Sequence, residues 1–134
     1  MENVEKMKAF FQKDAFAAGI GLEICSVTDR EAVITVQITD GHLNANGCVQ
    51  GGMLYSIADF AFATISNFLH PITVTQSGDI QYLRAAFTSS LKAVARERAR
   101  CGRNTACEVT VYDDKDEVVC VCHFSGFVKE TAAH

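Results

Sequence analysis

The chain has 134 residues, of which 49% are hydrophobic and 21% are charged, with one proline and a formal net charge of −4. This length suits a single domain over residues 1–134, which buries roughly two thirds of the surface that its unfolded form exposes. The composition excludes a disordered chain and a membrane-spanning one, and the negative charge argues against nucleic acid as the main partner.

The cysteines and the first residues bear on the compartment. Residues 1–5 lack the basic and apolar layout of an export signal, so we expect the cytoplasm, where the six cysteines stay reduced. Cys120 and Cys122 alternate in a strand pattern and therefore share one face, which indicates packing. The other cysteines and the four histidines show no ligand spacing, so we expect no metal site.

The first half of the chain predicts one helix, two strands and a second, longer helix. Apolar residues at near-helical spacing predict an amphipathic N-terminal helix over about 2–18. Residues 22–28 and 31–39 alternate apolar and polar and are separated by a short turn, which predicts a strand hairpin. A loop rich in glycine and asparagine covers 40–49, and the most apolar helical segment of the chain follows over 50–69.

The second half predicts four strands, over 72–84, 89–101, 104–112 and 118–128. A helix as apolar as 50–69 needs cover on most of its circumference, and only a curved antiparallel sheet is available to supply it. The sequence therefore predicts an α+β fold in which about six strands wrap one long helix. Exposed sheet edges are removed when two copies pair, so we expect a homo-oligomer.

One acid, Asp59, lies inside the apolar helix. If the helix is buried, desolvation disfavours the charged carboxylate, so Asp59 needs either a partner or a chemical role. It either caps a backbone group or takes part in catalysis. Five residues around it are apolar: Ile57, Ala58, Phe60, Ala61 and Phe62.

Gly51 and Gly52 begin the same helix. Backbone N–H groups in the first turn of a helix lack intrahelical acceptors and lie at the positive end of the helix dipole, so they can stabilise a developing oxyanion. The alternative is that the glycines only allow close packing of helix and sheet. Gly52 and Asp59 are seven residues apart, about 10 Å along the helix axis, so one water cannot touch both within one chain.

The segments Asn44-Ala45-Asn46-Gly47-Cys48-Val49-Gln50-Gly51-Gly52 and Ser56-Ile57-Ala58-Asp59 resemble the hotdog-fold thioesterases of the phenylacetate-pathway (PaaI-like) type. The resemblance covers about residues 20–128. The family has an asparagine, a His-Gly-Gly six residues later, and an acid nine residues after the histidine. Gln50 stands here in place of that histidine. Tyr82-Leu83-Arg84 and Gly102-Arg103-Asn104-Thr105 also resemble family segments.

The resemblance implies an acyl-coenzyme A thioesterase that releases a carboxylic acid and free coenzyme A without a cofactor or metal. Asp59 would be a general base or a nucleophile, and it would face the helix start of a partner protomer in a homodimer, with a homotetramer as the expected assembly. Gly51 would donate to the oxyanion, and Gln50 can also donate but cannot carry a proton. We expect the pH profile to depend on Asp59 alone.

Other site residues implied by the resemblance each have a plainer reading. Asn44 would position the water or the acid, or is a turn residue. Thr75 would place a hydroxyl near the acid, or is an ordinary strand threonine. Gly52, Arg103 and Asn104 would contact the substrate.

An arginine row and several apolar side chains are further candidates for substrate contacts. Arg96, Arg98 and Arg100 alternate and so are predicted to share one strand face, either toward the nucleotide end of coenzyme A or toward solvent. The acyl pocket would be apolar or aromatic, lined by Tyr55, Phe60, Phe62, Phe68 and Leu69. Three alternatives to the hydrolase stay open: a dehydratase, for which no histidine is well placed, an acyl-ligand binding domain without turnover, and a subunit that serves only in assembly.

Overall fold

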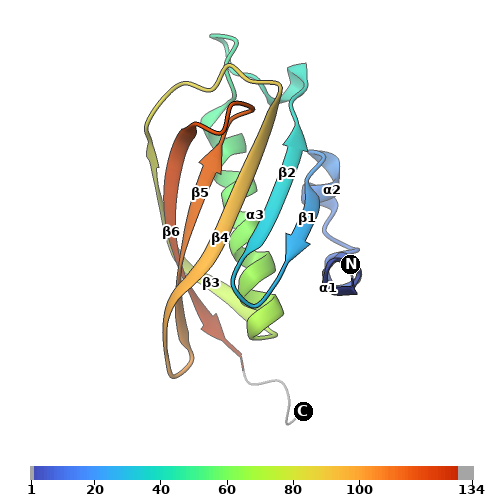
Figure 1. Cartoon of the computed structure of the whole chain (residues 1–134), viewed down its shortest axis with the longest axis vertical. Coiled ribbons are helices and arrows are strands. Elements are labelled where there is room, and N and C mark those ends of the chain that lie inside the picture. Colours follow the sequence, from blue (N-terminus) through green and yellow to red (C-terminus); the bar gives the residue numbers. More distant parts are fainter. Residues whose placement is uncertain (1, 130–134) are drawn as a thin grey trace.

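A single antiparallel sheet curves around one long helix. A computed structural model of the chain describes residues 2–129. The sheet has six strands in the order β1-β2-β4-β5-β6-β3, and the helix α3, Gly51–Leu69, lies against its concave side (Figure 1). The strands are β1 Glu23–Val27, β2 Ala32–Gln37, β3 Thr73–Tyr82, β4 Ser90–Cys101, β5 Asn104–Tyr112 and β6 Val118–Val128. The predicted α+β architecture is confirmed, and every predicted strand is present with its ends shifted by at most two residues.

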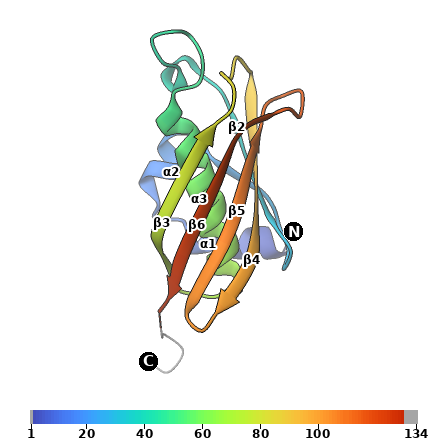
Figure 2. The ribbon, with the colours of Figure 1, turned by 90° about the vertical axis from the view of Figure 1, so that its left-hand side faces the viewer.

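The N-terminal segment differs from the prediction of one helix over 2–18. It forms two helices, α1 Glu2–Phe10 and α2 Ala15–Gly19, which lie on the β1 side of α3 (Figures 1 and 2). The break follows from Asp14, whose side chain accepts a hydrogen bond from the Ala17 N–H at 3.0 Å and so starts a new helix. The break also lets Phe11 pack against Phe60 of α3, with ring centroids 4.9 Å apart.

One side of α3 fills the core and the other side stays open. Ile57, Ala58, Ala61 and Ile65 are fully buried against the sheet, as expected for the apolar face of a core helix. The opposite side carries Gly52, Ser56, Asp59 and Ala63, which are exposed or partly exposed. We call these four residues the open strip of α3. The single chain therefore leaves uncovered the part of α3 that carries Asp59.

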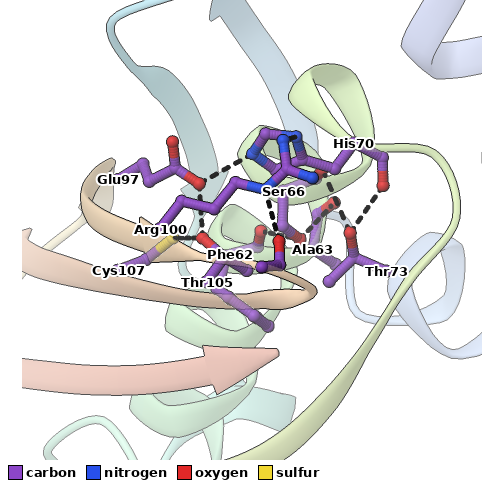
Figure 3. A network of polar contacts seen from close by, with 10 residues as sticks. Phe62, Ala63, Ser66, His70, Thr73, Glu97, Arg100, Thr105 and Cys107 are labelled. Carbon is purple, nitrogen blue, oxygen red and sulfur yellow. Dashed lines mark hydrogen bonds and ion pairs between the residues drawn. The ribbon is translucent and has the colours of Figure 1, made fainter. Parts of the chain in front are cut away.

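A polar network ties the C-terminal end of α3 to the sheet (Figure 3). The ring Nε2 of His70 lies 2.7 Å from Glu97 Oε2, and the buried Thr105 hydroxyl donates to the same oxygen at 2.5 Å. Arg100 reaches the other ring nitrogen of His70 at 3.2 Å. Because an arginine can only donate, Nδ1 of His70 accepts and Nε2 carries the proton. His70 therefore has a structural role, in holding the end of α3 to β4 and β5.

Candidate active site

Gln50 caps the first turn of α3. Its backbone is extended, at φ −65° and ψ 138°, and its side-chain Oε1 accepts a hydrogen bond from the Gly52 N–H at 2.5 Å. Its main-chain oxygen accepts from the N–H groups of Met53 and Leu54 at 2.9 and 3.2 Å. The Gly51 N–H has no acceptor within residues 2–129, and neither of the Nε2 protons of Gln50 is bonded there. The helix start therefore presents one open backbone donor and one open amide group side by side.

The loop before the helix is held by Asn44 and His42. Asn44 Oδ1 accepts from the backbone N–H groups of Asn46 and Cys48 at 2.9 and 3.2 Å, and Asn44 Nδ2 donates to Cys48 Sγ at 3.3 Å. These bonds show a turn role for Asn44, and a direct contact with substrate stays a prediction.

Both ring nitrogens of His42 are engaged by the backbone. Nδ1 accepts from the Thr39 N–H at 2.9 Å, and Nε2 lies 2.8 Å from the Ile20 carbonyl oxygen, to which it donates. This ring is therefore already satisfied, so it is poorly suited to shuttle a proton for the site although it lies close in sequence to Gln50.

Asp59 has no hydrogen-bond partner in the described part of the chain. No backbone group there donates to it, so the geometry gives no support to a capping role. Burial raises the pKa of the Asp59 carboxyl above its ordinary value, and the carboxylate of Asp14, the residue that caps the start of α2, raises this pKa further. Burial and the charge of Asp59 also raise the pKa of Tyr55, one turn earlier in α3. Such a carboxylate, partly buried and without a donor, retains the basicity that a general base needs.

The predicted site residues separate into two groups. Asn44, Gln50, Gly51 and Gly52 meet at the start of α3, whereas Asp59 lies two turns along the open strip, about 10 Å away. Thr75 is exposed on β3. It lies seven residues before Tyr82, the last residue of the strand, whose hydroxyl contacts Gly51.

Arg103 and Asn104 lie at the opposite end of the sheet from the start of α3, at the β4–β5 turn (Figure 1). The Arg103 guanidinium lies 5.8 Å from the Phe127 ring centre, and Asn104 Oδ1 accepts from Gln76 Nε2 at 2.9 Å. Within one chain, the fold does not bring Arg103 or Asn104 to Gly51.

The prediction that Arg96, Arg98 and Arg100 share one face is wrong. A register shift in β4 between Glu97 and Ala99 inserts a bulge, so alternation fails there. Arg96 stands opposite Glu108 and pairs with Glu31, whereas Arg100 stands opposite the buried Thr105 and contacts His70.

The prediction that Phe62 lines the acyl pocket is also wrong. Phe62 is 1% exposed and stacks on Phe124, so it fills the core.

Two clefts flank the start of α3. One, of about 310 Å³, is lined by residues that include Asn44, Val49, Gly51, Tyr82, Leu83 and Arg84. The other, of about 390 Å³, is lined by residues that include Phe16, Ile20, Leu43, Gln50, Gly52 and Met53.

Tyr82 is the site residue that the sequence interpretation missed. Its membership of a family-like segment was the available signal, but its contact with Gly51 depends on where β3 ends.

No helix among the described residues is long and apolar enough to cross a membrane. Within 2–129 there is also no group of three or more histidine, cysteine or acidic side chains placed to hold a metal ion.

Comparison with known proteins places the chain among thioesterases. No protein-family model matches the sequence. The acyl-coenzyme A thioesterase PaaI of Escherichia coli is 30% identical over 112 residues, which cover 83% of this chain and 80% of that protein.

Solved structures agree with this sequence match. The structure of E. coli PaaI, from the phenylacetic acid degradation operon, superposes with a TM-score of 0.88 at 25% identity, covering 96% of this chain and 94% of the other. A mutant structure of the phenylacetic acid degradation protein PaaI of Thermus thermophilus gives a TM-score of 0.81 at 29% identity, with coverage of 87% and 100%. The chain thus belongs to the PaaI-like thioester hydrolases of the hotdog fold.

Proposed function

We propose that the protein hydrolyses an acyl-coenzyme A thioester to a carboxylic acid and free coenzyme A. The observation that carries this proposal is that α3 holds both an open oxyanion donor and an unpartnered acid, each of which is one half of a hydrolytic site. The open Gly51 N–H lies at the start of α3 and the unpartnered Asp59 lies on its open strip, too far apart to act on one thioester. We place the thioester between Gly51 of one protomer and Asp59 of another.

Asp59 activates the attack on the thioester carbonyl carbon by one of two routes. As a general base it removes a proton from water while the water oxygen bonds to the carbon, and the intermediate then expels the thiolate of coenzyme A, which takes up a proton. As a nucleophile its carboxylate bonds to the carbon, the thiolate leaves, and water hydrolyses the resulting mixed anhydride. Both routes use the ionised carboxylate, and neither requires a cofactor or a metal.

The start of α3 supplies the oxyanion donors. The carbonyl oxygen gains negative charge as the carbon becomes tetrahedral, and the Gly51 N–H at the positive end of the helix dipole can bind it. We assign the Nε2 amide of Gln50 as the second donor, because Oε1 of the same group is already bound to Gly52. A Cβ added at Gly52 would lie 2.7 Å from Gln50 Oε1, so any larger residue there would displace the Gln50 amide from this position.

A homodimer supplies the two halves in this proposal. β3 is an edge strand, and apolar side chains are exposed on it and just before it: Val74 of β3 is 39% exposed and Ile72, which precedes the strand, is 41% exposed. Pairing two β3 edges removes unpaired backbone groups and covers apolar surface. The same pairing would bring the open strip of each α3 toward the other protomer. The same proposal has four further parts. The protein acts in the cytoplasm as a homotetramer, and the Thr75 hydroxyl lies near Asp59 of the assembled site. The nucleotide end of coenzyme A contacts Arg103 and Asn104.

Thiol release from a panel of short, medium, aryl and long acyl-coenzyme A thioesters tests the function, with Asp59→Asn alongside the parent. Turnover by the parent and its loss in Asp59→Asn support the hydrolase. Binding of the thioesters by the parent without thiol release would favour an acyl-ligand binding domain. Turnover that is insensitive to Asp59→Asn would contradict the mechanism, and absence of both binding and turnover would leave assembly as the role.

A further inference from the structure

We propose that Tyr82 is a positioning residue for the reaction, acting through the Gly51–Gly52 peptide on the side chain of Gln50. This inference deepens the proposed hydrolase function and rests on it. Tyr82 ends β3, where it pairs with Cys120 of β6, and β3 brings it against the first turn of α3. Tyr82 and Gln50 contact opposite sides of one peptide group, the one that joins Gly51 and Gly52.

The first contact is between Tyr82 and Gly51. The phenol hydroxyl donates to the Gly51 carbonyl oxygen at 3.1 Å. The ring also lies directly against the glycine, because a Cβ added to Gly51 would be 3.1 Å from the hydroxyl oxygen and 3.3 Å from two ring carbons. Gly51 is therefore small for a second reason besides access to its N–H: a larger residue would displace Tyr82.

The second contact leaves the other side of the same peptide group. The Gly51 carbonyl belongs to the peptide whose N–H is that of Gly52, and this N–H donates to Gln50 Oε1 at 2.5 Å. Hydrogen bonds in series polarise one another, so the bond from Tyr82 strengthens the bond to Gln50. We call this series, from the Tyr82 hydroxyl through the Gly51–Gly52 peptide to Gln50 Oε1, the Tyr82 relay.

The relay has a chemical consequence for Gln50. A glutamine amide can turn over and exchange its oxygen and nitrogen, and only the oxygen can accept from the Gly52 N–H. By favouring that bond, the relay keeps the Nε2 donors free for the thioester oxygen. In a family where this position carries histidine, the relay explains how a neutral amide is held in the one orientation that donates.

The exposure of Tyr82 fits this role better than a core role. The side chain is 54% exposed and lines the cleft of about 310 Å³ beside Gly51, so a thioester that reaches Gly51 passes next to it. Burial of part of the ring raises the pKa of the phenol further above neutral, so the hydroxyl carries its proton and can donate. A tyrosine that served only to fill the core would be buried.

Kinetics of Tyr82→Phe and of a double-mutant cycle with Gln50→Ala test the relay. We expect Tyr82→Phe to lower kcat about five- to tenfold, the factor for one lost neutral hydrogen bond, with KM changed less than about twofold. In the Gln50→Ala background the same change should have little effect, because the relay then has no end point. Tyr112→Phe, which removes a phenol hydroxyl on β5 away from the site, is the matched control and should match the parent. An unchanged kcat in Tyr82→Phe, or equal losses with and without Gln50, would overturn the proposal.

A second measurement separates the relay from the thioesterase activity. The amide proton of Gly52 should resonate downfield in the ¹⁵N-labelled parent and move upfield in Tyr82→Phe, while it should stay in place in Tyr112→Phe. If the parent shows no turnover with any thioester, the proposed function fails, and the Gly52 shift alone then decides the relay. A Gly52 amide proton that is indifferent to Tyr82→Phe would overturn the relay whatever the activity.

Discussion

The side-chain oxygen of Gln50 lies 2.5 Å from the Gly52 nitrogen and accepts its hydrogen bond. This contact decides which groups remain open at the start of α3, because it occupies the Gly52 N–H and leaves the Gly51 N–H without an acceptor in residues 2–129. A histidine at this position can accept the same bond through one ring nitrogen, but it also adds a group that titrates near neutral pH. Gln50 keeps the cap and removes the titration.

Replacing Gln50 by histidine therefore changes the pH profile. We expect Gln50→His to add an ionisation near pH 6.5, the ordinary pKa of histidine, to a kcat/KM profile that depends only on Asp59 in the parent. The profile measured from pH 4 to 9 on both proteins checks this. A Gln50→His profile that overlays the parent would mean that position 50 does not face the reacting atoms.

Asp59→Asn separates catalysis from stability. Removing the base should lower kcat by about 10²–10⁴, the usual contribution of general acid–base catalysis. The folded protein should be as stable as the parent or more stable at neutral pH, since the variant no longer holds a partly buried charge without a hydrogen-bond donor. Thiol release and thermal unfolding measure the two effects. A marked loss of stability would show that Asp59 has a structural partner outside the described residues.

Asp14 gives a way to move the acidic limb of the activity profile. Burial is the larger cause of the raised pKa of Asp59, and the Asp14 carboxylate is the second. Asp14→Asn retains an N-cap for α2 but removes the charge, so the apparent pKa should fall and activity should persist to lower pH.

The effect of Asp14 on stability has the corresponding sign. Folding raises the pKa of the Asp59 carboxyl, so the folded state is favoured while this group is protonated and less favoured once it ionises. The free energy of unfolding therefore declines as the pH rises above 3.8, the ordinary pKa of the group. Asp14→Asn should weaken this decline. Asp29→Asn, in the β1–β2 turn, is the control and should leave the activity limb in place. A limb that does not move in Asp14→Asn would show that the two carboxylates are not coupled.

The outcome of the sequence interpretation depends on how local each signal was. The strands and α3 were predictable, because burial of one side of an element leaves a repeating apolar pattern in its own sequence. The break at Asp14 and the bulge after Glu97 were not, because single residues interrupt patterns that otherwise continue on both sides. The capping bond of Gln50 and the contact of Tyr82 with Gly51 join residues whose approach is set by the curvature of the sheet.

His70 lies in the polar network at the other end of α3, away from Gln50. His70→Ala leaves the partly buried Glu97 carboxylate and its Thr105 donor without the ring that completes their hydrogen bonding. We expect it to lower the free energy of unfolding by about 1–3 kcal/mol, the usual effect of removing one partner from a buried hydrogen bond. His123→Ala is the matched control, because His123 is exposed on β6 and its nearest acidic oxygens lie 3.4 and 3.6 Å away. That variant should change the free energy of unfolding by no more than about 0.5 kcal/mol. Urea titration of both variants measures the difference, and equal effects would mean that the His70 network does not anchor α3 to the sheet.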